Sequence, residues 1–291
     1  WNMSPMNISG HTKVFAVLGH PIGHTLSPVM HNAAFQALGM DAIYLAFDVH
    51  PDRLLSVLAA MKDMGLGGVN ITVPLKEVAA KGLPQLDDSA RLLGAVNTVK
   101  FMPDGMIGYN TDGAGFLQAV EEAFGESVAG KSVFICGAGG AGRAVALVCA
   151  GSGVRSLTIA DTDPARPGNV AREVESQFGV GVTIASRWEA EAREADIVLQ
   201  ATPLGMKPGD PLPLKAEAFR SGQAVFDLVY MYPETAFMKA AKANGAQTAN
   251  GLGMLLHQGV HAFEIWTGVK PPVDVMKKAL EKVVYGPQEK N

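Results

Sequence analysis

The sequence predicts an α/β protein built from two domains, each with a mostly parallel β-sheet. Short apolar runs alternate with helix-like stretches along almost the whole chain, which is typical of strands joined by helices. The strand-like runs form two series, and the second series starts at Lys131. A length of 291 residues is enough for two domains with buried cores. The junction is expected between Thr111 and Lys131.

In the first series, predicted helices lie between the predicted strands, and one more helix follows the last strand. The pair Ser27-Pro28 is expected to start the first helix, with the serine as N-cap and the proline in the first turn. The strands are expected at Lys13–Gly19, Ala42–Val49, Gly68–Val73 and Ala95–Phe101. The helices are expected at Ser27–Leu38, Pro51–Met64 and Asp112–Phe124.

The second series follows the same alternation and ends in three closing helices. The strands are expected at Ser132–Cys136, Ser156–Ala160, Val182–Ser186, Ile197–Thr202 and Ala224–Val229. The helices are expected at Ala141–Ser152 and Ala165–Phe178, and then near Glu234–Asn244, Leu252–Trp266 and Pro272–Val284. Hydrophobic periodicity leaves open which domain the closing helices join.

The composition excludes several classes of function. The formal net charge is −4 with no block of basic residues, so nucleic acid is not expected as a partner. No apolar run reaches the roughly 18 residues that a membrane span needs, and residues 1–4 lack the basic start of a signal peptide. Cys136 and Cys149 lie in apolar runs and are expected to be buried thiols in a reducing compartment. We therefore expect a cytoplasmic protein.

A glycine-rich motif follows the predicted strand Ser132–Cys136. The run Gly137-Ala138-Gly139-Gly140-Ala141-Gly142 fits the pattern G-x-G-x-x-G and leads into a predicted helix. The first glycine of this pattern allows a tight turn, the second lets the backbone approach a pyrophosphate, and the third lets the helix pack on the strand. The motif predicts a Rossmann dinucleotide-binding domain with residues 137–141 at the cofactor. The alternative is a glycine-rich turn that binds no ligand.

An acidic residue ends the second predicted strand of this domain. Asp161 follows Gly142 by 19 positions (161 − 142), near the place where Rossmann domains carry the acid that binds the adenosine ribose. A carboxylate there can accept hydrogen bonds from both ribose hydroxyls, and it would repel the 2′-phosphate of NADP. Arg166, the nearest cation, lies further along the chain. We expect NAD rather than NADP; the simpler alternative makes Asp161 a turn or helix-cap acid.

Polar side chains of the first domain gather where strands are predicted to end. Open α/β sheets bind ligands at the carboxyl ends of their strands, so these segments are candidates for a second ligand site. Their hydroxyls, amides, ammonium and carboxylate suit a ligand rich in hydroxyls that carries one acidic group. They lack the spacing of a metal site, so no metal is expected. The segments are His24–Pro28, Asn70–Lys76, Asn97-Thr98 and Asn110–Asp112.

Taken in order, these and other segments resemble the shikimate dehydrogenase family from about Val14 to Leu280. So many ordered matches are much more specific than any single motif. The matching segments are Gly19–Asn32, Asn70–Lys76, Gly94–Thr98, Gly108–Gly113, Gly137–Gly142, Ala201–Met206, Asp227–Tyr230 and Gly251–Gln258.

The resemblance implies a role for each matching residue. Thr25 and Ser27 match the hydroxyl pair that holds the substrate carboxylate, where the family usually has serine at the Thr25 position. Lys76 and Asp112 match the catalytic pair. Further substrate contacts are implied for Asn70, Thr72, Asn97, Tyr230 and Gln258. Cofactor contacts are implied for Asp88, Thr202, Leu228 and Gly251, and are also expected for Asp161 and Arg166.

Two departures from the family pattern bear on the cofactor. Gln200 replaces the asparagine that usually precedes Ala-Thr-Pro, which changes the hydrogen bonding available there. Ala160-Asp161-Thr162 stands where NADP-using members have a basic Asn-Arg-Thr signature. This segment resembles the branch of the family that oxidises quinate or shikimate with NAD.

The catalytic pair has a chemical rationale. Oxidation of an alcohol releases a hydride, which the nicotinamide takes, and a proton, which a protein group must take. An isolated lysine titrates near pH ~10.4, too high for an efficient base at neutral pH, so Lys76 and Asp112 are expected to act as a coupled pair. Lys76 would move the proton of the reacting oxygen, and Asp112 would orient Lys76. The simpler alternatives are a surface helix lysine and a helix N-cap, respectively.

We therefore predict an oxidoreductase of the shikimate pathway of aromatic amino acid biosynthesis. It would interconvert shikimate and 3-dehydroshikimate, quinate and 3-dehydroquinate, or both. The alternatives are a dehydrogenase of a modified substrate such as aminoshikimate and a non-catalytic cofactor-binding regulator. Residues 1–112 and 251–291 are expected to form the substrate-binding domain, and residues 113–250 the NAD(P)-binding domain. The expected partner is a small hydroxy-acid substrate, and the expected assembly is a monomer or homodimer.

Overall fold

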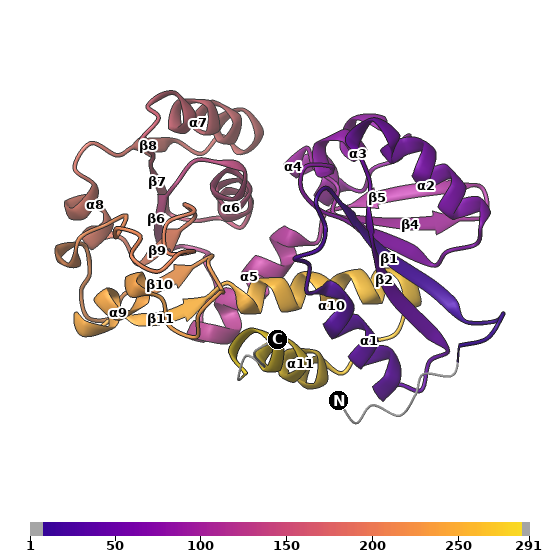
Figure 1. The fold of residues 1–291 in the computed structure, drawn as a ribbon. Coiled ribbons are helices and arrows are strands. Elements are labelled where there is room, and N and C mark those ends of the chain that lie inside the picture. Colours follow the sequence, from indigo (N-terminus) through magenta and orange to yellow (C-terminus); the bar gives the residue numbers. More distant parts are fainter. Residues whose placement is uncertain (1–7, 287–291) are drawn as a thin grey trace. The chain divides into compact units, whose positions relative to one another are not determined.

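A computed structural model describes residues 8–286, so the expectation for residues 1–4 lies outside the described part of the chain. The chain divides into two compact units, whose elements are labelled in Figure 1. Unit 1 contains the residues up to Asp112 and those from Gln258 onward, and unit 2 contains Gly113–His257. The chain passes between the units at the start of helix α5 (Asp112–Phe124) and again within helix α10 (Leu252–Thr267).

Unit 1 is built on a mixed sheet with the strand order β2-β1-β3-β4-β5. β1 pairs in parallel with β2 and β3, whereas β4 pairs antiparallel with both β3 and β5. β4 departs from the expected parallel pairing, and a tight hairpin joins it to β5, a strand that was not predicted, which makes this second pair antiparallel. The strands are β1 (Lys13–Gly19), β2 (Ala42–Asp48), β3 (Gly68–Ile71), β4 (Thr98–Met102) and β5 (Gly105–Tyr109).

The helices of unit 1 include two that hydrophobic periodicity did not predict. α3 and α4 have seven and six residues, too few for a periodic pattern to emerge. α1 packs against α11. The helices are α1 (Ser27–Ala37), η1 (Pro51–Arg53), α2 (Leu54–Asp63), α3 (Lys76–Gly82), α4 (Asp88–Leu93) and α11 (Val273–Tyr285).

Helix α1 begins differently from its prediction. Pro28 lies in the first turn as expected, but the N-cap residue is Leu26, and Ser27 is already helical. The N-cap expectation for Ser27 is therefore wrong. Its hydroxyl lies 3.4 Å from Thr25 Oγ1. The Ser27 hydroxyl therefore lies near its neighbour Thr25 and does not cap the helix.

Unit 2 is built on a wholly parallel sheet with the strand order β11-β10-β9-β6-β7-β8. Counted from β6 along the chain, this is the order 3-2-1-4-5-6 of the Rossmann fold, so the predicted α/β fold class is confirmed. β11 was not predicted, because its residues Gln247–Asn250 are mostly polar and lie at a sheet edge. The strands are β6 (Ser132–Cys136), β7 (Ser156–Ala160), β8 (Val182–Ile184), β9 (Ile197–Gln200), β10 (Ala224–Asp227) and β11 (Gln247–Asn250).

The helices of unit 2 follow the parallel strands, as crossover connections require. They are most of α5, α6 (Gly140–Gly151), α7 (Ala165–Phe178), α8 (Trp188–Glu194), η2 (Ala216–Ala218), α9 (Ala236–Ala243) and the first part of α10. No helix within residues 8–286 is both long and apolar enough to cross a membrane.

Each unit has its own apolar core of fully buried side chains from the strands and the helices that cover them. In unit 1 this core includes Leu18, Leu54, Leu58, Val69 and Val99. In unit 2 it includes Phe134, Val198, Phe219, Val225 and Phe237.

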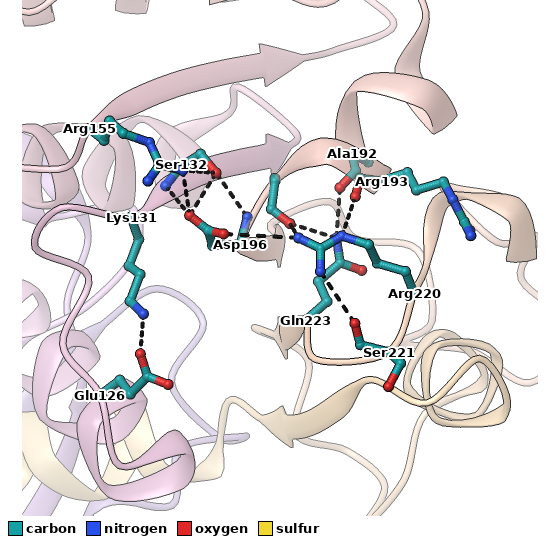
Figure 2. A network of polar contacts seen from close by, with 11 residues as sticks. Glu126, Lys131, Ser132, Arg155, Ala192, Arg193, Asp196, Arg220, Ser221 and Gln223 are labelled. Atoms are coloured by element: carbon teal, nitrogen blue, oxygen red, sulfur yellow. Dashed lines mark hydrogen bonds and ion pairs between the residues drawn. The ribbon is translucent and has the colours of Figure 1, made fainter.

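An acidic side chain, Asp196, links the amino-terminal ends of two strands in the sheet of unit 2. Asp196, directly before β9, accepts hydrogen bonds from the backbone N–H and hydroxyl of Ser132 at 2.8 and 2.9 Å, and from Arg155 at 2.8 Å (Figure 2). The Ser132 N–H keeps the pKa of Asp196 below its ordinary value. These contacts tie the starts of β6 and β9 together. They lie at the opposite end of the strands from the glycine turn, so their role is structural.

Candidate active site

The polar segments of unit 1 meet at the carboxyl ends of β1 and β3. The two strands are parallel neighbours, so the residues that follow them emerge on the same edge of the sheet. The backbone N–H of Thr72 donates to the Leu18 carbonyl at 2.8 Å, which holds the two strand ends together. Thr25 and Ser27 follow β1, and Lys76 follows β3 as the first residue of α3.

Lys76 and Asp112 form a direct pair. Lys76 Nζ donates to Asp112 Oδ2 at 2.7 Å, and the two side chains are 27% and 19% exposed. Asn110 rather than Asp112 accepts the capping bond at the start of α5, because Asn110 Oδ1 accepts from the Asp112 N–H at 2.9 Å. The Asp112 carboxylate is therefore available to Lys76. The pair can hold and move a proton where a ligand enters.

Asn97 contacts Asp112, Asn70 contacts Asn97, and both asparagines use their amide hydrogens inside the protein. Asn97 Nδ2 donates to Asp112 Oδ1 and to Thr111 Oγ1, each at 2.9 Å. Asn70 Nδ2 donates to the Asn97 carbonyl and to Thr98 Oγ1, each at 3.0 Å. Both asparagines were expected to contact substrate; the structure shows their amide hydrogens donated to protein groups of the site.

The other expected substrate residues are divided between the units. Thr25, Thr72 and Gln258 belong to unit 1, and all are partly exposed. Tyr230 follows β10 in unit 2, where burial raises the pKa of its phenol, so the phenol is neutral and can donate a hydrogen bond. Within residues 8–286, no cluster of three or more His, Cys, Asp or Glu could hold a metal ion.

The glycine turn after β6 fits a dinucleotide. Gly137 has a φ of +104°, and a Cβ there would lie 2.9 Å from the Ala201 carbonyl group. A Cβ on Gly142 would lie 1.8 Å from the Gly137 oxygen, so the helix can approach the strand only without a side chain. At Gly139 and Gly140, by contrast, no atom lies within 4 Å of an added Cβ. The turn is closed toward the sheet and open at the start of α6, where helix N–H groups can bind phosphate.

Strand register brings further expected cofactor residues to the same edge of the sheet as this turn. Cys136, Gln200, Asp227 and Asn250 lie level across β6, β9, β10 and β11. The residues that follow them include the expected cofactor contacts Gly137, Thr202, Leu228 and Gly251. A Cβ at Gly251 would lie 2.1 Å from the Leu228 oxygen, so glycine is needed there.

Asp161 sits directly on the glycine turn. Its Oδ2 accepts from the Ala138 N–H at 2.7 Å, and its Oδ1 accepts from the Asp163 N–H at 2.8 Å. The Asp161 carboxylate thus accepts a hydrogen bond within its own turn and also contacts the glycine motif. Arg166 is exposed and pairs with Asp163 at 3.2 Å.

Asp88 is an exposed helix residue of unit 1. It lies on α4 in unit 1, its side chain is 96% exposed, and it pairs with Arg91 at 2.8 Å. The N-cap of that helix is its neighbour Asp87, which accepts from the Ser89 N–H at 3.0 Å.

Sequence analysis assigned no role to a buried acid at the end of β10. Asp227 is fully buried and accepts hydrogen bonds from Thr235 Oγ1 at 2.6 Å, the Val229 N–H at 3.0 Å and Gln200 Nε2 at 3.3 Å. Burial raises its pKa to about 6. Gln200 also donates to the Leu204 carbonyl at 2.7 Å, so it joins the turns after β9 and β10. The available signal was an acid at the end of an apolar strand.

Comparison with known proteins decides the family. A model described as the shikimate dehydrogenase substrate binding domain matches residues 17–99, and one described as the shikimate 5'-dehydrogenase C-terminal domain matches residues 251–281. A third model, the ThiF family, matches residues 113–180. A protein of Methanothermobacter thermautotrophicus named shikimate dehydrogenase (NADP(+)) is 42% identical, over 95% of this chain and 99% of its own. The chain belongs to the shikimate dehydrogenase family.

Solved structures of the family have the same fold. Shikimate 5-dehydrogenase of Listeria monocytogenes, in complex with shikimate and NAD, matches with a TM-score of 0.88 and 38% identity, over 94% of this chain and 98% of its own. Quinate dehydrogenase of Corynebacterium glutamicum, in complex with NAD, matches with a TM-score of 0.86 and 33% identity, over 92% and 98%. The predicted family membership is thereby confirmed.

Proposed function

We propose that this protein is an NAD-dependent dehydrogenase that interconverts shikimate and 3-dehydroshikimate. The observation that carries the proposal is the 2.7 Å pair of Lys76 and Asp112 at the strand ends of unit 1. Unit 1 would bind the substrate, and unit 2 would bind the cofactor at its glycine turn. Family relatives that are named shikimate dehydrogenase support the reaction.

Lys76 is the group that moves the proton. When bound, the nicotinamide takes or supplies the hydride. During reduction Lys76 donates a proton to the substrate carbonyl oxygen, and during oxidation it takes the proton back from the hydroxyl. Asp112 accepts a hydrogen bond from Lys76 and keeps the amine aimed at the reacting oxygen. The hydroxyls of Thr25 and Ser27 donate to the substrate carboxylate.

The preference for NAD rests on Asp161. Its carboxylate is held on the Ala138 N–H of the glycine turn, where the adenosine ribose of a Rossmann cofactor lies. Two ribose hydroxyls can donate to it, whereas a 2′-phosphate would be repelled by its charge. Thr162, the next residue, offers no positive charge to a phosphate. A relative of the same family is named shikimate dehydrogenase (NADP(+)), so the choice of NAD over NADP is proposed from Asp161 alone.

Quinate is a second candidate substrate. Thr25 adds a methyl group at a position where the family usually has serine, and this changes the space around the substrate carboxylate. The segment Ala160–Thr162 resembles the NAD-using quinate branch, and a quinate dehydrogenase in complex with NAD is among the similar structures.

The test is a set of four assays that follow the absorbance of the reduced nicotinamide. Shikimate and quinate are each offered with NAD and with NADP. We expect the fastest turnover with shikimate and NAD, and no turnover in any combination would overturn the proposal. Lys76→Ala should lower kcat by about 10²- to 10⁴-fold. Lys81→Ala, an exposed lysine on the same helix, is the matched control and should leave kcat unchanged.

A further inference from the structure

A chain of buried polar side chains runs from β2 to the catalytic pair. Tyr44 Oη lies 2.6 Å from Asn70 Oδ1, and Asn70 Nδ2 lies 3.0 Å from Thr98 Oγ1. Thr98 Oγ1 lies 2.9 Å from Asn97 Oδ1, and Asn97 Nδ2 lies 2.9 Å from Asp112 Oδ1. The first four residues are at most 5% exposed, so water does not compete for these contacts.

Fixed backbone groups force the direction of every hydrogen bond in this chain. The Asn97 carbonyl can only accept, so the Asn70 atom that faces it at 3.0 Å must be the amide nitrogen. Asn70 Oδ1 therefore faces Tyr44, and the phenol is the donor. Similarly, the Thr111 N–H can only donate, so the Asn97 atom that faces it at 2.8 Å must be the oxygen.

The rest of the chain follows from these two assignments. Thr98 accepts from Asn70 and donates its own proton to Asn97 Oδ1. Asn97 then presents its amide nitrogen to Asp112 Oδ1. All donors point the same way, from the phenol to the carboxylate, and such bonds strengthen one another.

The packing around Tyr44 keeps its phenol a donor in a fixed place. The ring stacks on His31 at 4.4 Å between centroids with an interplanar angle of 14°. Burial raises the pKa of Tyr44 well above its ordinary value and lowers the pKa of His31 to about 3, so both rings stay neutral. The Ser27 side chain, a proposed ligand of the substrate carboxylate, acts on the pKa of this phenol in the opposite direction to burial.

We propose that Tyr44 is a positioning residue that orients Asp112 through Asn70, Thr98 and Asn97. Asp112 accepts a hydrogen bond from Asn97 on one oxygen and from Lys76 on the other, so its carboxylate cannot rotate without losing one of these bonds. The backbone groups fix which way round each amide lies, and Tyr44 supplies the donor that holds Asn70 Oδ1 at the start of the series. The inference rests on the proposed function, because it assigns Asp112 to the reaction.

The test begins with Tyr44→Phe, which removes only the hydroxyl. Losing one hydrogen bond of the chain should lower kcat/KM for shikimate about 3- to 10-fold. The Kd for NAD, titrated without substrate, should not change, because the proposed cofactor residues on the glycine turn lie in unit 2. Tyr109→Phe is the matched control, since this β5 tyrosine meets the chain only through its backbone carbonyl. It should keep wild-type kcat/KM.

A second variant, which removes a different hydrogen bond of the same series, tests whether the bonds between Tyr44 and Asp112 act together. Thr98→Val removes the donor to Asn97 from another strand and should produce a similar loss. Because both variants interrupt one chain, the double variant should lose little more than the worse single variant. Independent losses that multiply in the double variant would overturn the proposal, as would a wild-type kcat/KM in Tyr44→Phe.

A readout without turnover separates this inference from the proposed function. The ¹³C chemical shift of the Asp112 carboxyl carbon, assigned by its loss in Asp112→Asn, should change in Tyr44→Phe and Thr98→Val but not in Tyr109→Phe. If the chemical shift changes but the protein turns over no substrate, the hydrogen-bonded series from Tyr44 to Asp112 is supported and the proposed dehydrogenase activity is refuted. Thermal unfolding checks that both variants are folded. If they are and the chemical shift is unchanged in both, the proposal that Tyr44 positions Asp112 is refuted.

Discussion

The replacement Asp112→Asn tests the catalytic pair with almost no change in shape. An asparagine has one acceptor oxygen and one donor nitrogen. Asp112 accepts from Lys76 Nζ at 2.7 Å on one oxygen and from Asn97 Nδ2 at 2.9 Å on the other. Whichever way the new amide turns, its NH₂ group faces another donor, so one of the two bonds is lost together with the charge that holds Lys76.

The expected loss can be worked from these contacts. A hydrogen bond to a charged group contributes about 1.5–3 kcal/mol, which corresponds to a fall of about 10- to 150-fold in kcat/KM for shikimate. Initial rates from the absorbance of the reduced nicotinamide measure it, and thermal unfolding checks that the variant is folded. Asp104→Asn, on the exposed β4–β5 turn, is the control. A folded Asp112→Asn enzyme with kcat/KM within about 2-fold of wild type would refute the argument.

Two further predictions concern buried or cofactor-side acids. Asp161→Asn should lower the ratio of kcat/KM for NAD to that for NADP by about 10-fold, because the charged acceptor is lost; an unchanged ratio would count against Asp161 as the ribose acid. Burial raises the pKa of Asp227 to about 6 from 3.8, so between these pH values the folded state holds a proton that the unfolded state has released. Its contribution to stability therefore falls as pH rises through this range, and urea unfolding should show Asp227→Asn gaining up to about 3 kcal/mol on wild type between pH ~4 and ~7. A constant difference would contradict the shift.

Local patterns in the sequence were sufficient for most elements of the fold. The strand Lys13–Gly19 and the helix Ala165–Phe178 were predicted to the residue, because apolar periodicity and turn residues mark such segments clearly. The elements α3, α4, β5 and β11 were missed. They are short or lie at a sheet edge, where pairing partners rather than the segment's own pattern decide the structure.

The candidate site divides in the same way. The identities of Lys76, Asp112 and the glycine turn could be taken from the sequence, because ordered motifs and spacing carry that information. Their geometry could not, since Lys76 and Asp112 are 36 residues apart and meet only when α3 and α5 are placed by the sheet.

What the sequence by itself determined was therefore the fold class, the family, and which residues are capable of the chemistry. Only the tertiary structure decided that Asn97 donates to Asp112, that Asp161 rests on the Ala138 N–H, and that Tyr44 donates toward the catalytic pair. The physical reason is that periodicity and turn preference act over a few neighbouring residues. A hydrogen bond, by contrast, depends on distances of about 3 Å between atoms that only the packed sheet brings together.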